Sequence, residues 1–185
     1  MEFKSSGQTH ARKLSAPLIV IAILLQLAVA PFISVFGARF NFMVVIVIVG
    51  SMGLDPRSAV FFGFLTGLFY DLTAPVPVGL MALLLAVCAY LVASGSRGIA
   101  AGFNADSVRI AFVSVFVVVL LYALVMFFMG IEGSFFKSFF VVGLLSSLLD
   151  CVACIPFLML SGRNDQARGF SASPYSKTLR FKRRR

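Results

Sequence analysis

Long runs of apolar residues occupy almost the whole chain, and short clusters of charged, glycine and proline residues separate them. Charged residues make up only 12% of the sequence, against about 25% in an ordinary soluble domain. So few charges could not cover the surface of a water-soluble fold. A helix that crosses a bilayer needs about 20 predominantly apolar residues. We therefore expect an all-α fold, a polytopic integral membrane protein with about six transmembrane helices.

The bounds of the expected helices follow from the breaks between the apolar runs. They are 15–36, 40–54, 58–72, 78–95, 107–129 and 135–160. A basic N-terminal segment (1–14) precedes this transmembrane domain (15–160). A basic tail (161–185), whose composition indicates disorder, follows it.

Two features of these runs leave alternatives. The second and third helices are short for a bilayer, so they form either a re-entrant hairpin or two full spans that thin the bilayer. The glycine-rich third helix favours full spans, because it packs best at full length. The first run ends near Ala28-Val29-Ala30, which resembles a signal-peptide cleavage site. Because Pro31 follows, we expect an uncleaved first helix.

Lysine and arginine are distributed unevenly between the two sides of such a bundle. With the N-terminus in the cytoplasm, 14 of the 16 basic residues are cytoplasmic, and only Arg39 and Lys137 lie outside. Cytoplasmic loops of membrane proteins carry an excess of basic residues. We therefore expect both ends to be cytoplasmic. The crowding of basic residues at the ends favours contact of the tail with anionic lipids over binding of nucleic acid.

Small residues at four-residue spacing mark one face of the third helix. This face comprises Ala59, Gly63, Gly67 and Asp71. Residues four apart are neighbours on a helix, and a Gly-xxx-Gly pair lets a second backbone approach closely. The fourth helix starts at Gly79 and continues with alanines at three- and four-residue spacing. We expect the two helices to pack tightly, with Gly63, Gly67, Asp71 and Gly79 as candidate packing or partner-contact residues.

Polar side chains inside the apolar runs need hydrogen-bond partners. Asp71, at the end of its helix, either pins the turn by binding free N–H groups around Gly79 or contacts a partner helix or ligand. Asp150 lies near the middle of the sixth helix, where a carboxylate costs about 2.5–3.5 kcal/mol. No lysine or arginine lies near the middle of an expected span, so Asp150 is either protonated or hydrogen-bonded. Gln26 in the first helix is its candidate partner.

The chain carries no pattern that is typical of an enzyme or a metal site. It has no nucleophile motif, phosphate loop, paired catalytic carboxylates or metal-ligand cluster. Cys88, Cys151 and Cys154 lie inside apolar runs, and the lone His10 lies outside them. We therefore expect no catalytic activity, no cofactor and no disulfide framework.

Several of these residues resemble the signature region of the MreD family, the bacterial rod shape-determining membrane proteins. The resemblance rests on the run GFLTGLFYDL from Gly63 to Leu72, on Gly79-Leu80-Met81-Ala82 and on Ala89-Tyr90-Leu91. Leu25-Gln26 and Arg39-Phe40-Asn41 also fit, although the family usually has proline where Phe40 stands. The resemblance covers about 15–95.

The resemblance implies a non-enzymatic scaffold of the cell-elongation complex, which makes peptidoglycan, in the bacterial inner membrane. The implied partners are a bitopic MreC-like protein and, indirectly, MreB and a RodA-type glycosyltransferase with a class B penicillin-binding transpeptidase. The alternative is the substrate-binding membrane subunit of an energy-coupling-factor vitamin transporter, which has a similar size and helix number. Such subunits often carry an Ala-xxx-Ala contact in the first helix, but here Gln26 follows Ala22.

Overall fold

The computed structural model describes residues 16–35, 38–74, 77–97, 103–130, 136, 139–140 and 143–169. The predicted order of six helices is confirmed. They are α1 (Ala16–Ala28), α2 (Phe42–Ser51), α3 (Pro56–Thr73), α4 (Leu80–Gly95), α5 (Ala105–Phe128) and α6 (Leu144–Gly169). A small antiparallel hairpin of β1 (Ser34–Val35) and β2 (Ala38–Arg39) connects α1 to α2.

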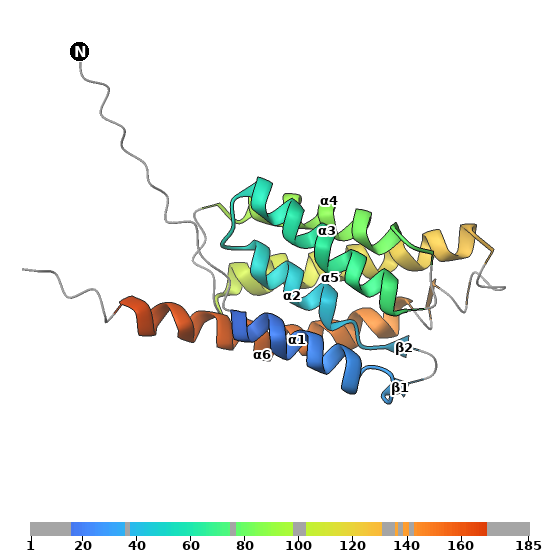
Figure 1. Cartoon of the computed structure of the whole chain (residues 1–185), viewed down its shortest axis with the longest axis horizontal. Coiled ribbons are helices and arrows are strands. Elements are labelled where there is room, and N and C mark those ends of the chain that lie inside the picture. Colours follow the sequence, from blue (N-terminus) through green and yellow to red (C-terminus); the bar gives the residue numbers. More distant parts are fainter. Residues whose placement is uncertain are drawn as a thin grey trace, which may run out of the picture.

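The short helix α2 forms the centre of the bundle. All ten of its residues are buried, and it packs against each of the other five helices. Figure 1 shows α1 and α3 on either side of it. A helix that is apolar all round can be buried in a protein core or can face lipid. The sequence of α2 (FMVVIVIVGS) is compatible with the central position that it occupies.

The helices run up and down, so their ends gather at two ends of the bundle (Figure 1). The start of α1 and the end of α6 lie at one end, and the β-hairpin lies at the other. Arg57 in the first turn of α3, Arg97 just after α4 and Arg109 near the start of α5 are all exposed. They lie at the end that holds the start of α1, which is the distribution that the basic-residue pattern predicts.

The outside of the bundle is apolar along its length. Two helical segments in the described part of the chain, Ala105–Phe128 and Leu144–Gly162, are long and apolar enough to cross a membrane. Bulky apolar side chains point outward, including Phe61 (71% exposed), Val113 (63%) and Val152 (63%). Such a surface suits hydrocarbon and is unlike that of a water-soluble bundle.

The first helix is shorter than predicted. It ends at Ala28, whereas the sequence suggested a helix that continued to residue 36. Proline at position 31 has no N–H group, and its ring disfavours helical backbone in the residue before it. The chain therefore leaves the helix in a turn, where the Phe32 N–H donates to the Val29 carbonyl at 3.1 Å, and enters the hairpin.

The last helix extends further along the chain than predicted. The described residues before α6 (136, 139–140 and 143) are helical, α6 itself begins at Leu144, and it continues past residue 160 to Gly169. The first part of the tail that was expected to be disordered is therefore helical. Segment 1–14 and the tail beyond residue 169 lie outside the described residues.

Candidate functional site

The start of α4 is held by a carboxylate from another helix. Asp71, in the last turn of α3, is 1% exposed. Its Oδ2 accepts hydrogen bonds from the N–H groups of Gly79 (2.9 Å) and Ala82 (3.1 Å), and its Oδ1 accepts one from Met81 (3.3 Å). Asp71 therefore pins the turn between α3 and α4, the structural role that the sequence suggested for it.

This arrangement compensates for the absence of a capping side chain at the start of α4. The first N–H groups of a helix have no partner within that helix. The N-cap residue of α4 is Gly79, which has no side chain to accept them, and its φ of 102° lies in the left-handed region that favours glycine. In hydrocarbon, unpaired N–H groups cost several kcal/mol each. Asp71 replaces the missing cap.

Glycines bring the backbones of α3 and α4 into contact one and two helical turns before Asp71 along α3. A Cβ atom added at Gly63 would lie 2.5 Å from the Leu85 carbonyl oxygen, and one at Gly67 would lie 2.5 Å from the Ala82 Cα. No side chain fits at either position without a shift of the α4 backbone. The predicted close seam is present, but it runs along Ala82, Leu85 and Ala89. Ala86, which belongs to the alanines of α4 at three- and four-residue spacing, is only half-buried.

The start of α2 is held in the same manner by three side chains. Asp150 Oδ1 in α6 accepts from the Asn41 N–H at 2.7 Å, and Gln26 Oε1 in α1 accepts from the Phe42 N–H at 2.9 Å. The Asn41 side chain accepts from the Val44 N–H at 3.3 Å. Three helices therefore meet at one set of amide groups.

Gln26 and Asp150 do not bond to each other in the described part of the chain, contrary to the pairing that the sequence suggested. They bind successive amides of the same backbone instead. The carboxylate of Asp150 is 0% exposed, and its Oδ2 has no hydrogen-bond partner among the described residues. Asp71 uses both oxygens, whereas Asp150 uses one.

Asn41 is the site residue that sequence reasoning did not single out as a cap. An asparagine directly before an apolar run is an N-cap signal, so the information was available. The sequence could not predict the hydrogen bond from the Asn41 N–H to Asp150, because the two residues are 109 positions apart in the chain.

These polar groups are arranged to stabilise helix starts. Asp71 accepts from three backbone amides and Asp150 from one, and each carboxylate joins its own helix to the start of another. No group of three or more His, Cys, Asp or Glu residues that could hold a metal occurs among the described residues. The chemistry of the site is therefore the joining of helices that are distant in sequence.

Comparison with known proteins gives one match. The family model described as rod shape-determining protein MreD matches residues 9–161. No curated protein and no solved structure matches the chain significantly.

Proposed function

Because the chain belongs to the MreD family, whose members are rod shape-determining membrane proteins, we propose that it is a non-enzymatic scaffold of the bacterial cell-elongation complex. The observation that carries this proposal is the family match across residues 9–161, which includes the whole helical bundle up to Ser161. The vitamin-transport alternative has no comparable support.

We further propose that all six helices lie in the inner membrane, with both chain ends in the cytoplasm. The exposed arginines at one end of the bundle support this threading, as does the apolar outer surface. In this orientation the starts of α2 and α4 lie toward the extracytoplasmic side. Both are short helices (10 and 16 residues), so their first amides lie within or close to the hydrocarbon. Water cannot pair these amides in hydrocarbon, so the capping carboxylates supply the acceptors that they need.

The α3–α4 pair is the proposed contact surface for the transmembrane helix of a bitopic MreC-like partner. Asp71, Gly63 and Gly67 are buried between the two helices, so they act on a partner indirectly. They fix the spacing and tilt of the pair, and the apolar side chains on its outer face, such as Phe61 and Leu83, make the contact. Through that partner the protein would act with MreB, the glycosyltransferase and the transpeptidase.

Depletion of the protein in a rod-shaped host tests the shape role. Cells that round or widen, without a new vitamin requirement, are expected. A vitamin requirement with unchanged cell shape would contradict the proposal.

Substitution of Asp71 tests the contact surface. Asp71→Ala leaves the amides of Gly79, Met81 and Ala82 without an acceptor, so α4 should shift and recovery of the MreC-like partner should fall. Asp55→Ala is the matched control, because Asp55 is exposed at the start of the same helix and makes no capping bond. Equal recovery of the partner with both variants would exclude α3–α4 as the contact.

A further inference from the structure

A lateral groove runs between α1 and α3. Both helices pack on α2, but among the described residues they do not pack extensively on each other. Figure 1 shows α2 lying between them. Two cavities of about 290 Å³ each lie along this groove, one lined in part by Met43 and Ile46 of α2 and the other by Phe40, just before α2. We call them the apolar section and the polar section.

The apolar section lies nearer the start of α1. Its walls and floor are Ile19, Ile23, Met43, Ile46, Phe62, Leu65, Thr66 and Phe69. Thr66 is the one residue of this set with a polar side chain. The section is therefore lined almost entirely by hydrocarbon, and Leu65 in its wall is 62% exposed at the surface of the bundle.

The polar section continues the groove toward the β-hairpin. It is lined by Gln26, Leu27, Ala30, Pro31, Phe40, Tyr70, Thr73 and Ala74. The two linings follow one another along both helices: Gln26 comes one turn after Ile23, and Tyr70 directly follows Phe69. From Ile19 to Gln26 the wall rises about 10 Å.

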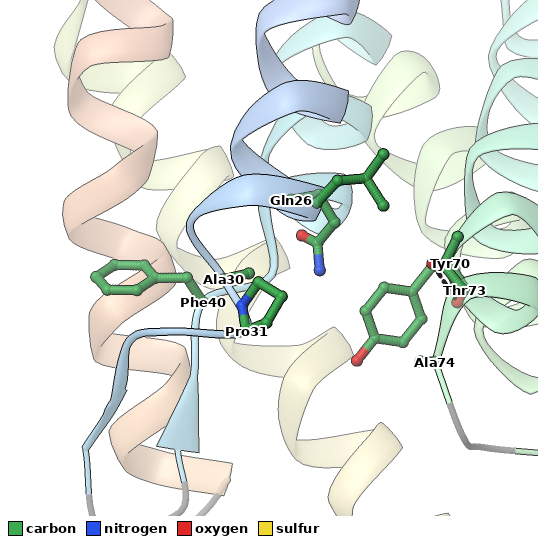
Figure 2. A pocket seen from close by; sticks show the side chains of 8 residues that line it. Gln26, Ala30, Pro31, Phe40, Tyr70, Thr73 and Ala74 are labelled. Carbon is green, nitrogen blue, oxygen red and sulfur yellow. Dashed lines mark hydrogen bonds between the residues drawn. The ribbon is translucent and has the colours of Figure 1, made fainter.

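The amide of Gln26 is oriented by the cap of α2. Because its Oε1 accepts from the Phe42 N–H, its NH₂ group must face the other way. In Figure 2 this nitrogen points into the space between Pro31 and Tyr70, and the Tyr70 hydroxyl points into the same space. The polar section therefore presents a fixed donor directly beyond a hydrocarbon-like groove.

We propose that the groove binds a membrane phospholipid. One acyl chain lies in the apolar section, and the ester carbonyl that begins the chain accepts a hydrogen bond from Gln26 Nε2. The order of the two sections matches the chemistry of the ligand, in which the acceptor is joined directly to the hydrocarbon. This inference rests on the membrane threading proposed above but not on the shape role.

The walls of the groove favour a lipid chain over a partner helix. Helices that pack closely in membranes meet at small residues. The small residues of α3, Gly63 and Gly67, already face α4. Toward the groove α3 presents Phe62, Leu65 and Phe69 instead, which leave room for a single extended chain.

Photolabelling tests the proposal. The full-length protein is placed in nanodiscs of phosphatidylethanolamine and phosphatidylglycerol, with a trace of phosphatidylglycerol that carries a diazirine midway along one acyl chain. Mass spectrometry locates the labelled peptides. Labelling is expected to concentrate at Ile19–Ile23 and Phe62–Phe69. Uniform labelling of the outer surface, with Val113 and Val152 labelled equally, would overturn the proposal.

Three variants separate occupancy from folding. Thr66→Phe fills the apolar section and should abolish the preferential labelling, whereas Leu24→Phe adds the same ring on the exposed side of α1 and should not. Gln26→Glu keeps the acceptor for Phe42 but removes the donor, so labelling should fall about fivefold, the effect of one hydrogen bond. Unchanged labelling in Thr66→Phe would overturn the proposal.

A partner helix in the groove gives a different result. If a photoreactive amino acid at position 66 captures a protein from cell membranes and no lipid, the groove is a protein contact and the lipid proposal is wrong. Absence of lipid label from the entire chain would overturn the membrane threading together with it.

Discussion

Replacement of the two buried aspartates by asparagine should destabilise the protein to different extents. Asp71 accepts hydrogen bonds through both oxygens, from the amides of Gly79, Met81 and Ala82. In Asp71→Asn one oxygen becomes an NH₂ group that faces a backbone N–H. At least one hydrogen bond to a charged acceptor is lost, and such bonds contribute about 1.5–3 kcal/mol. With the new clash between donors, we expect a loss of about 2–3 kcal/mol.

Asp150→Asn should be tolerated. Only Oδ1 of Asp150 accepts a hydrogen bond, from the Asn41 N–H, and Oδ2 has no partner among the described residues. The amide NH₂ can take the place of Oδ2 while the amide oxygen keeps the bond. We expect a loss below about 1 kcal/mol. Asp150→Leu, which leaves the Asn41 N–H unpaired, should cost about 1–3 kcal/mol.

Thermal unfolding in detergent measures these differences. The three free cysteines are buried, so a fluorogenic maleimide reports their exposure as the bundle opens. At about 2–4 °C per kcal/mol, Asp71→Asn should lower Tm by roughly 4–12 °C and Asp150→Asn by less than roughly 4 °C. Equal losses for the two asparagine variants would refute the proposed difference in how the carboxylates are used.

Three further substitutions test the seam, the turn and the second cap by the same unfolding measurement. Gly63→Ala should cost about 1–3 kcal/mol, because its Cβ would meet the α4 backbone. Gly95→Ala, where the added atom meets nothing within 4 Å, should not destabilise the protein. Similar losses of stability for the two variants would refute the tight seam. Gly79→Ala should cost about 1–2 kcal/mol because the backbone of Gly79 is left-handed, since nothing lies within 4 Å of the added atom. An unchanged Tm would contradict this expected cost. Gln26→Leu should cost about 1–3 kcal/mol by leaving the Phe42 N–H unpaired, and a neutral result would argue against that cap.

The parts of the fold that depend on neighbours in sequence were predictable. Apolar runs located the six helices, and four-residue spacing identified the face of Gly63, Gly67 and Asp71. The reach of Asp71 to the next helix start was predictable because a short proline turn separates the two. In each case the interacting groups lie within a few turns of one another along the chain.

The parts that depend on packing at long range were not predictable. The sequence of α2 shows that it is apolar, but not that five helices surround it. Asp150 was readable as a deep acid, yet its partner lies in a backbone 109 residues away. Pro31 has a second effect that the prediction did not include. It disfavours cleavage after Ala30, but it also ends α1 and leads into the hairpin.

Membrane threading is the premise for placing both caps and the groove toward the extracytoplasmic side. Alkaline phosphatase is active only outside the cytoplasm, so fusions to it report the side on which each position lies. We predict an active fusion after Gly130, beyond α5, and an inactive fusion after Arg185, which should instead support fluorescence of a fused green fluorescent protein. An active phosphatase at Arg185 would contradict the threading.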